Sequence, residues 1–132
     1  MSAGRPFFDT NILLYLASPD ADKARLAESL MEAGGVISVQ VLNEFASVAS
    51  RKFKMTWSEI HEALAAIRES FEIVSLTVET HEIALTIIEK YGFSFYDCLI
   101  LAAAAQAECR TVYSEDMQNG QVVEGVTIRN PF

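Results

Sequence analysis

The sequence predicts an α/β fold in which helices flank a short, central parallel sheet. Short apolar and β-branched runs alternate with longer stretches of helical period, which is typical of repeated β-α units. The strand candidates are almost wholly apolar, as strands buried on both faces are. The chain has 132 residues, of which 51% are hydrophobic and 21% charged, so we expect a single domain over residues 1–132.

Five short runs are the predicted strands. They lie at residues 6–8, 36–37, 73–74, 111–113 and 126–128. We find no internal repeat, low-complexity tract or linker between them, which favours one continuous sheet.

The helices are marked by their ends. Ser18 followed by Pro19 predicts the start of a helix over about residues 20–32, and Gly34 stands where that helix would stop. Thr56 and Glu59 have the spacing of a capping box, which predicts a second helix start.

Two further helices are expected in the second half of the chain. Thr77 is placed to cap a helix that ends at Gly92. Residues 95–107 are apolar nearly all round, which indicates a central, buried helix.

Composition excludes several classes of protein. No apolar run reaches the roughly 20 residues that cross a bilayer, and the first residues do not resemble a secretion signal, so we expect a cytoplasmic protein with no membrane partner. Cys98 and Cys109 lie in apolar stretches, where reduced thiols are expected. The sequence has no glycine-rich phosphate loop, which disfavours nucleotide-dependent chemistry.

Acidic residues follow two of the predicted strands. Asp9 comes directly after the first strand and Asp116 shortly after residues 111–113, and open parallel sheets bind ligands at this edge. Each acid also has a simpler interpretation, because Asp9 could merely cap the next helix and Asp116 could lie in a solvated turn.

Two more acids lie within predicted helices. Glu44 stands one position off the apolar face of a helix that Ser38 would cap, and most such glutamates are simply solvated. Asp97 lies three residues after Ser94, which fits a capping pattern, but it also opens the most apolar helix, where a carboxylate needs a partner.

Convergence of these carboxylates at one sheet edge would make a metal site. Clustered carboxylates repel one another unless a divalent cation neutralises them, and oxygen ligands select Mg²⁺ or Mn²⁺ over zinc. His61 and His81 lie on helix faces expected to be exposed, which further disfavours zinc. Such a site suits hydrolysis of phosphodiester bonds, with Ser114 and Asn11 as orienting hydrogen-bond donors.

Four segments together resemble the PIN-domain family, and more narrowly the VapC toxins of bacterial toxin-antitoxin pairs. They are FDTNIL at 8–13, SVQVLNEF at 38–45, YDCLILA at 96–102 and SED at 114–116. The resemblance in order and spacing covers the whole chain.

The resemblance implies a Mg²⁺- or Mn²⁺-dependent endoribonuclease that cuts RNA, forms a homodimer and is inhibited by a cognate, VapB-like antitoxin. Its metal-binding and catalytic acids fall on Asp9, Glu44, Asp97 and Asp116, and its small hydroxyl residue falls on Ser114. Many relatives have a further acid after the last of these. This chain has Met117, Gln118 and Asn119 there, so a fifth metal-binding carboxylate is not expected.

RNA binding has to overcome a formal net charge of −8. The densest basic run contains Arg51, Lys52 and Lys54, which either bind phosphate or complement the dipole at a helix end.

Two other functions stay open at this point: a receiver-like phosphotransfer domain with Asp9 as phosphoacceptor, and a non-catalytic acidic module that binds a basic peptide.

Overall fold

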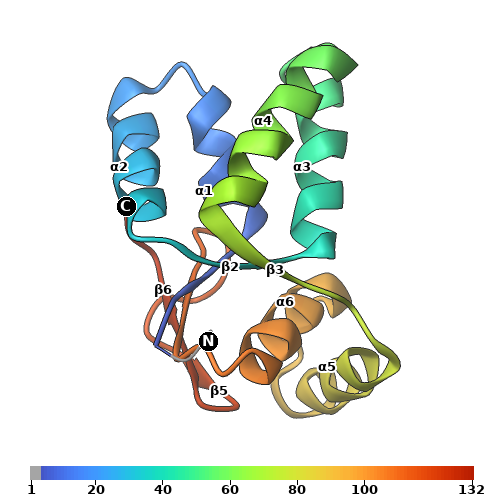
Figure 1. Ribbon diagram of the computed structural model, residues 1–132. Coiled ribbons are helices and arrows are strands. Elements are labelled where there is room, and N and C mark those ends of the chain that lie inside the picture. Colours follow the sequence, from blue (N-terminus) through green and yellow to red (C-terminus); the bar gives the residue numbers. More distant parts are fainter. Residues whose placement is uncertain (1–3) are drawn as a thin grey trace.

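A six-stranded sheet runs through the centre of the computed structural model, which describes residues 4–132 (Figure 1). The strands are β1 (Phe7–Phe8), β2 (Gly35–Ser38), β3 (Phe71–Val74), β4 (Thr111–Tyr113), β5 (Val122–Val123) and β6 (Val126–Arg129). Their order is β3-β2-β1-β4-β6-β5, and every pair is parallel except β5 with β6.

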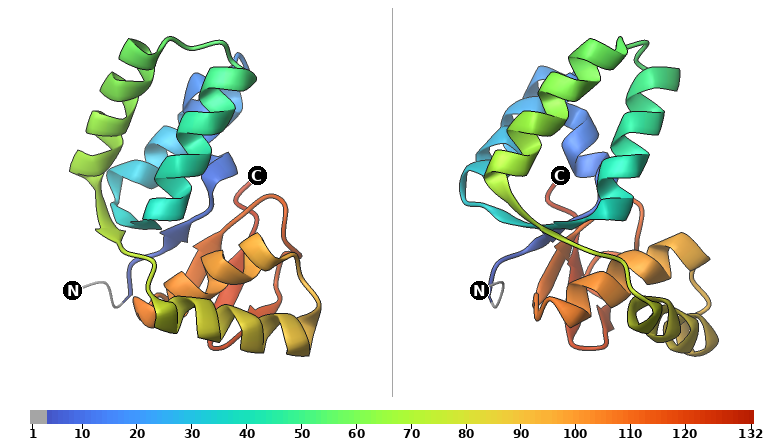
Figure 2. Two further views of the ribbon diagram at one scale, coloured as in Figure 1. Left: turned by 90° about the vertical axis from the view of Figure 1, so that its right-hand side faces the viewer. Right: turned by 45° about the vertical axis from the view of Figure 1, so that its right-hand side comes forward.

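Helices cover both faces of this sheet. They are α1 (Thr10–Leu14), the 3₁₀ turn η1 (Tyr15–Ala17), α2 (Ala21–Glu32), α3 (Val39–Arg51), α4 (Trp57–Ser70), α5 (Val78–Tyr91) and α6 (Phe95–Gln106). Figures 1 and 2 show α1 to α4 on one face and α5 with α6 on the other. The predicted class, a central and mainly parallel sheet flanked by helices, is confirmed.

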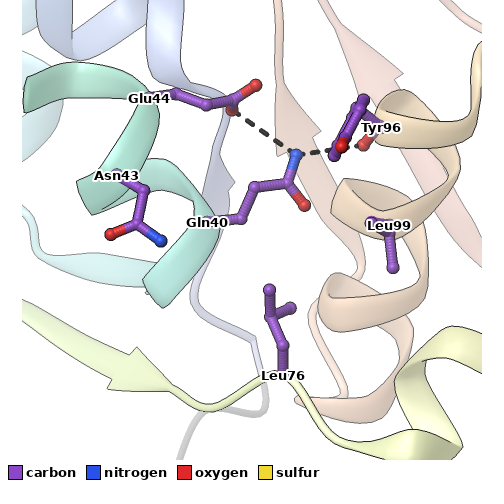
Figure 3. Close-up of a pocket in the computed structure, with 6 residues that line it drawn as sticks. All are labelled: Gln40, Asn43, Glu44, Leu76, Tyr96 and Leu99. Atoms are coloured by element: carbon purple, nitrogen blue, oxygen red, sulfur yellow. Dashed lines mark hydrogen bonds between the residues drawn. The ribbon is translucent and has the colours of Figure 1, made fainter. Parts of the chain in front are cut away.

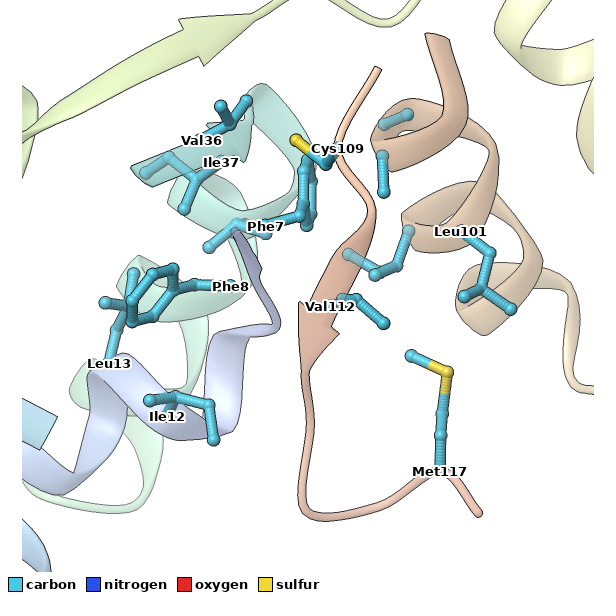
Figure 4. Close-up of a cluster of buried hydrophobic side chains, with 14 of the residues drawn as sticks. Phe7, Phe8, Ile12, Leu13, Val36, Ile37, Leu101, Cys109, Val112 and Met117 are labelled. Atoms are coloured by element: carbon cyan, nitrogen blue, oxygen red, sulfur yellow. The ribbon is translucent and has the colours of Figure 1, made fainter. Parts of the chain in front are cut away.

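The two residues of β1 contribute to the core on both faces of the sheet. Phe7 and Phe8 are fully buried, and Figure 4 shows Phe7 beside Cys109 on the α6 side while Phe8 points towards Leu13 of α1. The Phe8 ring packs edge-on against Phe71, with centroids 4.9 Å apart. Strand β1 is therefore held from both sides, which fixes the residue that follows it.

Gly35 lets β1 and β2 approach closely. A Cβ atom at this position would lie 2.7 Å from the carbonyl oxygen of Pro6 and 2.7 Å from Cε1 of Phe8. Only glycine fits there, because the obstructing Pro6 atom belongs to the backbone.

The predicted helix starts are largely confirmed. Thr56 and Thr77 each form a capping box, and Gly92 ends α5 in the left-handed conformation with φ of 72°. The prediction for α2 was wrong in its cap: Asp20, not Ser18, accepts the backbone N–H of Lys23, at 3.2 Å. Aspartate is as good an N-cap as serine. Pro19 then lies before the helix, where no helical hydrogen bond needs a backbone N–H.

Ser38 occupies the N-cap position of α3 but does not act as the sequence suggested. Its hydroxyl makes no capping bond and is buried without a hydrogen-bond partner among the described residues.

Strand β5 was not predicted from the sequence. It pairs with β6 through a tight turn in which Glu124 and Gly125 have φ of 50° and 80°. Both values are positive, as a type I′ hairpin requires, and two valines are too few to show an alternating pattern.

Other expectations about single side chains are confirmed. Cys98 and Cys109 are free and buried, and His61 and His81 are exposed. Within residues 4–132, no helix is long and apolar enough to span a membrane.

Candidate active site

The carboxyl ends of β1 and β4 form the base of the candidate site. These strands are neighbours at the point where the sheet order reverses, with β2 and β3 on one side and β6 with β5 on the other. Side chains that follow such strands converge in a crevice. Asp9 follows β1 and Ser114 follows β4.

Asp9 is the most buried carboxylate of the site, with 7% of its surface exposed. One oxygen accepts the backbone N–H of Thr10 at 2.7 Å, and the other accepts the Ser114 hydroxyl at 2.8 Å. Burial raises the pKa of Asp9 to about 6, although these two hydrogen bonds lower it. The negative charges of Asp97 and Glu44 raise the pKa further, so both carboxylates lie close enough to interact with Asp9.

Glu44 is joined to Asp9 through Thr10. The Thr10 hydroxyl donates to Glu44 Oε1 at 2.7 Å, while its backbone N–H binds Asp9. The Gln40 side-chain amide donates to the same Glu44 oxygen at 3.5 Å and to the carbonyl of Tyr96 at 3.2 Å (Figure 3). Sequence reasoning missed Thr10 and Gln40, whose roles depend on contacts between separate elements.

Asp97 lies in the first turn of α6, where its backbone N–H binds the hydroxyl of the cap residue Ser94 at 3.3 Å. Its half-buried position raises the pKa of Asp97, the Ser94 hydroxyl lowers it, and the charge of Asp116 raises it. Asp97 can therefore take part in the capped first turn of α6 and also belong to the acidic group.

The segment after β4 sends three side chains in different directions. Ser114 binds Asp9 and also accepts the backbone N–H of Met117 at 3.3 Å. Glu115 accepts the hydroxyl of Tyr15 and pairs with Lys23 at 2.9 Å. Asp116 is exposed, and its negative charge raises the pKa of Asp97.

The predicted basic residues lie at the C-terminal end of α3 and directly after it, and one of them lines a cavity together with an acid of the site. Lys52 lines a cavity of about 280 Å³ together with Asn11 and Asp116. Both polar side-chain atoms of Asn11 are buried without a hydrogen-bond partner in the described structure. Arg51 and Lys52 line a neighbouring cavity of about 360 Å³. Lys54 is exposed but lines neither cavity.

The four acids share one edge but do not form a closed metal cage. Within residues 4–132, no three His, Cys, Asp or Glu side chains are arranged so that they could hold a metal ion. The convergence of the four acids on one ion therefore stays a prediction.

The chemistry of the acids nevertheless fits a hard divalent cation. All potential ligands are oxygens, and none of the four carboxylates forms one of the ion pairs found among the described residues. A buried carboxylate with no cationic partner is costly, and each Asp9 oxygen keeps a second lone pair.

Comparison with known proteins identifies the fold. Residues 7–121 match the family model described as the PIN domain. No curated protein sequence matches the chain.

Solved structures with a similar fold have low sequence identity. A toxin-antitoxin complex from Klebsiella pneumoniae contains a chain 22% identical, with a TM-score of 0.75 and coverage of 96% of this chain and 98% of that one. VapC20 of Mycobacterium tuberculosis, a toxin that cleaves the sarcin-ricin loop, is 21% identical with a TM-score of 0.68 and coverage of 84% and 89%. VapBC2 of Rickettsia felis, bound to a DNA fragment from its promoter, is 20% identical with a TM-score of 0.68 and coverage of 95% and 97%.

The fold, the acids at the switch point of the sheet and a family match over most of the chain agree with one another. This chain belongs to the PIN-domain family.

Proposed function

We propose that this protein is a metal-dependent endoribonuclease that acts as the toxin of a toxin-antitoxin pair. The observation that carries the proposal is Asp9, a carboxylate that is buried at the switch point of the sheet near Glu44 and Asp97. It forms no ion pair with a basic side chain of residues 4–132. The cofactor would be Mg²⁺ or Mn²⁺, held by Asp9, Glu44, Asp97 and Asp116. A bound divalent ion would supply a water activated for attack on the phosphodiester.

The protein's own residues prepare this site. Ser114 and the backbone of Thr10 hold the Asp9 carboxylate in one orientation and favour its charged form. Thr10 and Gln40 orient the Glu44 carboxylate by donating hydrogen bonds to it. Lys52, beside Asp116, is placed to attract an RNA phosphate to the edge of the acidic group.

Solved structures with this fold support an antitoxin as the partner. Three of the solved structures with this fold are toxin-antitoxin assemblies. We infer that a VapB-like antitoxin binds this protein and inhibits it at the acidic site, since an arginine would neutralise the carboxylates in place of the metal. A homodimer and a cytoplasmic location complete the proposal.

The test is the cutting of end-labelled RNA in Mn²⁺, in Mg²⁺ and in a chelator. Cutting should require the metal. Asp9→Asn should lower it by at least about 100-fold, more than the roughly 10- to 100-fold typical of groups that only orient a ligand. Asp97→Asn should lower it as well, whereas a residue that only capped α6 would tolerate Asn.

Asp22→Asn provides the control, because Asp22 is an exposed aspartate in the first turn of α2. It should cut RNA at the wild-type rate. Metal-independent cutting, or full activity in Asp9→Asn, would contradict the mechanism. Transfer of a covalent phosphate from a small phosphodonor to Asp9 would support the receiver-like function, and binding of a basic peptide without any cutting would support the non-catalytic module.

A further inference from the structure

A cavity of about 310 Å³ lies beside Glu44, between α3, α6 and the segment that follows β3. Figure 3 shows the side chains that line it: Gln40, Asn43, Glu44, Leu76, Tyr96 and Leu99. This volume is at the lower end of the range of about 300 to 1,000 Å³ found for small-molecule sites. The cavity therefore suits one compact group.

Gln40 presents an unused hydrogen-bond acceptor to this cavity. The side chain is only 6% exposed, and its amide nitrogen donates to Glu44 and to the carbonyl of Tyr96. Because a carbonyl can only accept, the Tyr96 contact fixes which end of the amide is the nitrogen.

The other end of the amide, the Gln40 oxygen, is consequently the atom that still lacks a hydrogen bond. It is buried and has no hydrogen-bond partner in the part of the chain that the structure describes. Figure 3 shows it directed away from Glu44, towards the space between Leu76 and Leu99. A buried oxygen without a donor is costly, so a ligand with an N–H group at this point would be stabilising.

Tyr96 adds an aromatic surface at the same place. It is the second residue of α6, directly before Asp97, and 64% of its surface is exposed. Leu76 and Leu99 supply apolar walls. An exposed aromatic ring beside apolar walls is a platform on which a nucleobase can stack, whatever its identity.

We propose that this cavity binds one nucleobase of the RNA substrate, in the nucleotide next to the phosphodiester that is cut. The base stacks on Tyr96 and donates an N–H group to Gln40. Glu44 belongs both to the cavity and to the acidic group, which places the base beside the reacting phosphate. This inference rests on the proposed ribonuclease function, but it adds a subsite that recognises an uncharged part of the RNA, where the negative charge of the protein is no obstacle.

Short RNA oligomers with 2-aminopurine at successive positions test the subsite directly. They are mixed with the protein in a chelator, so that binding is measured without metal-dependent cutting. At one position, binding should quench the fluorescence by stacking. Tyr96→Ala should abolish this quenching and raise the Kd of that oligomer by about 5- to 100-fold, while Tyr96→Phe should keep both.

Trp57→Ala is the matched control. Trp57 is 67% exposed and begins α4, so it resembles Tyr96 in exposure and in its position in a helix, but it does not line the cavity. It should leave the quenching and the Kd unchanged.

The hydrogen bond to Gln40 is tested from the side of the RNA. Replacing 2-aminopurine by purine removes an amine but keeps the ring system, and should raise the wild-type Kd by about fivefold, the usual effect of one hydrogen bond. Gln40→Leu should bind the two oligomers equally.

The outcomes separate this inference from the proposed function. RNA cutting without any position whose quenching depends on Tyr96 would overturn the base subsite and leave the ribonuclease intact. Quenching that depends on Tyr96, in a protein that cuts no RNA with Mn²⁺, would support the subsite and remove the ribonuclease.

Discussion

Asp9 is held in a position that disfavours its own charge. Its pKa is raised from 3.8 to about 6 by burial, which corresponds to about 3 kcal/mol against the ionised form. Below pH 4 the carboxyl is protonated in both the folded and the unfolded chain and the burial has no such cost. As the pH rises from 4 to 6, the unfolded chain loses its proton first, so the folded state loses stability, and the full cost remains above pH 6.

Removing this charge should stabilise the protein while it abolishes activity. Asp9→Asn keeps the shape of the side chain and should raise the free energy of unfolding at pH 7.5 by about 1 to 3 kcal/mol without metal, with the difference vanishing towards pH 4. Urea unfolding at several pH values measures it.

A bound metal ion should also stabilise the folded protein, because it would neutralise the charge of Asp9. Mn²⁺ should raise the Tm of the wild type and raise that of Asp9→Asn much less, since the variant lacks the buried carboxylate whose charge the ion would neutralise. Equal stabilisation of both proteins by Mn²⁺ would show that the ion binds elsewhere.

Sequence reasoning at this scale identified the acids and one of the groups that orient them, the Ser114 hydroxyl that donates to Asp9, but it missed the others. Asp9, Asp97 and Asp116 follow strands or open helices, and such positions can be recognised from the chain alone. Thr10 and Gln40 act across elements, through bonds to Glu44 on α3 and to the backbone of α6, and no local pattern predicts such pairs.

At the scale of elements, the close contact of β1 with β2 determines where Asp9 lies. Gly35→Ala would force a Cβ atom against the Pro6 carbonyl and the Phe8 ring. We expect a loss of about 1 to 3 kcal/mol in unfolding free energy, as for other overpacked cores. RNA cutting should fall as well, because β1 must shift and Asp9 follows it directly.

Gly34→Ala separates these two effects. Gly34 has φ of 79°, so alanine there is strained by about 1 to 2 kcal/mol, but its Cβ would have no atom nearer than 3.8 Å. This variant should lose stability and still cut RNA at the wild-type rate at temperatures where it is folded. Equal loss of activity in both variants would argue against the displacement of β1.

Elements with strong local signals were predicted well, whereas the sequence missed β5 and the ends of two strands, which depend on pairing. Helices α4 and α5 have capping boxes that the sequence displays, whereas β5 exists because two valines pair with β6 across a tight turn. Strands β2 and β3 each proved two residues longer than predicted, since their register with each other includes Gly35 and Phe71.

For the molecule as a whole, the proposed function requires a chain with a net charge of −8 to bind RNA. The basic residues at the end of α3 are the candidates, and of these Lys52 shares a cavity with Asp116. Lys52→Ala should weaken RNA binding and reduce the dependence of log Kd on log salt by about 0.7, as expected for one lost phosphate contact on a single strand.

Lys54→Ala is the matched control, because Lys54 is an exposed lysine two residues away that does not line this cavity. Lys54→Ala should change the dependence of log Kd on log salt less than Lys52→Ala does. The double change Arg51→Glu with Lys54→Glu should still weaken RNA cutting, since it reverses two charges near the site. Unchanged cutting in that variant would exclude Arg51 and Lys54 from RNA binding.

The bond between Asp9 and Ser114 joins residues 105 positions apart in the chain. A ribosome must therefore synthesise most of the protein before the two residues can meet, and long-range pairings of this kind form late in folding. A nascent chain, or a fragment ending before β4, carries Asp9 without the hydroxyl that orients it. If the protein is a ribonuclease, its activity should thus appear abruptly, after synthesis has passed Ser114, and prematurely terminated chains should cut no RNA.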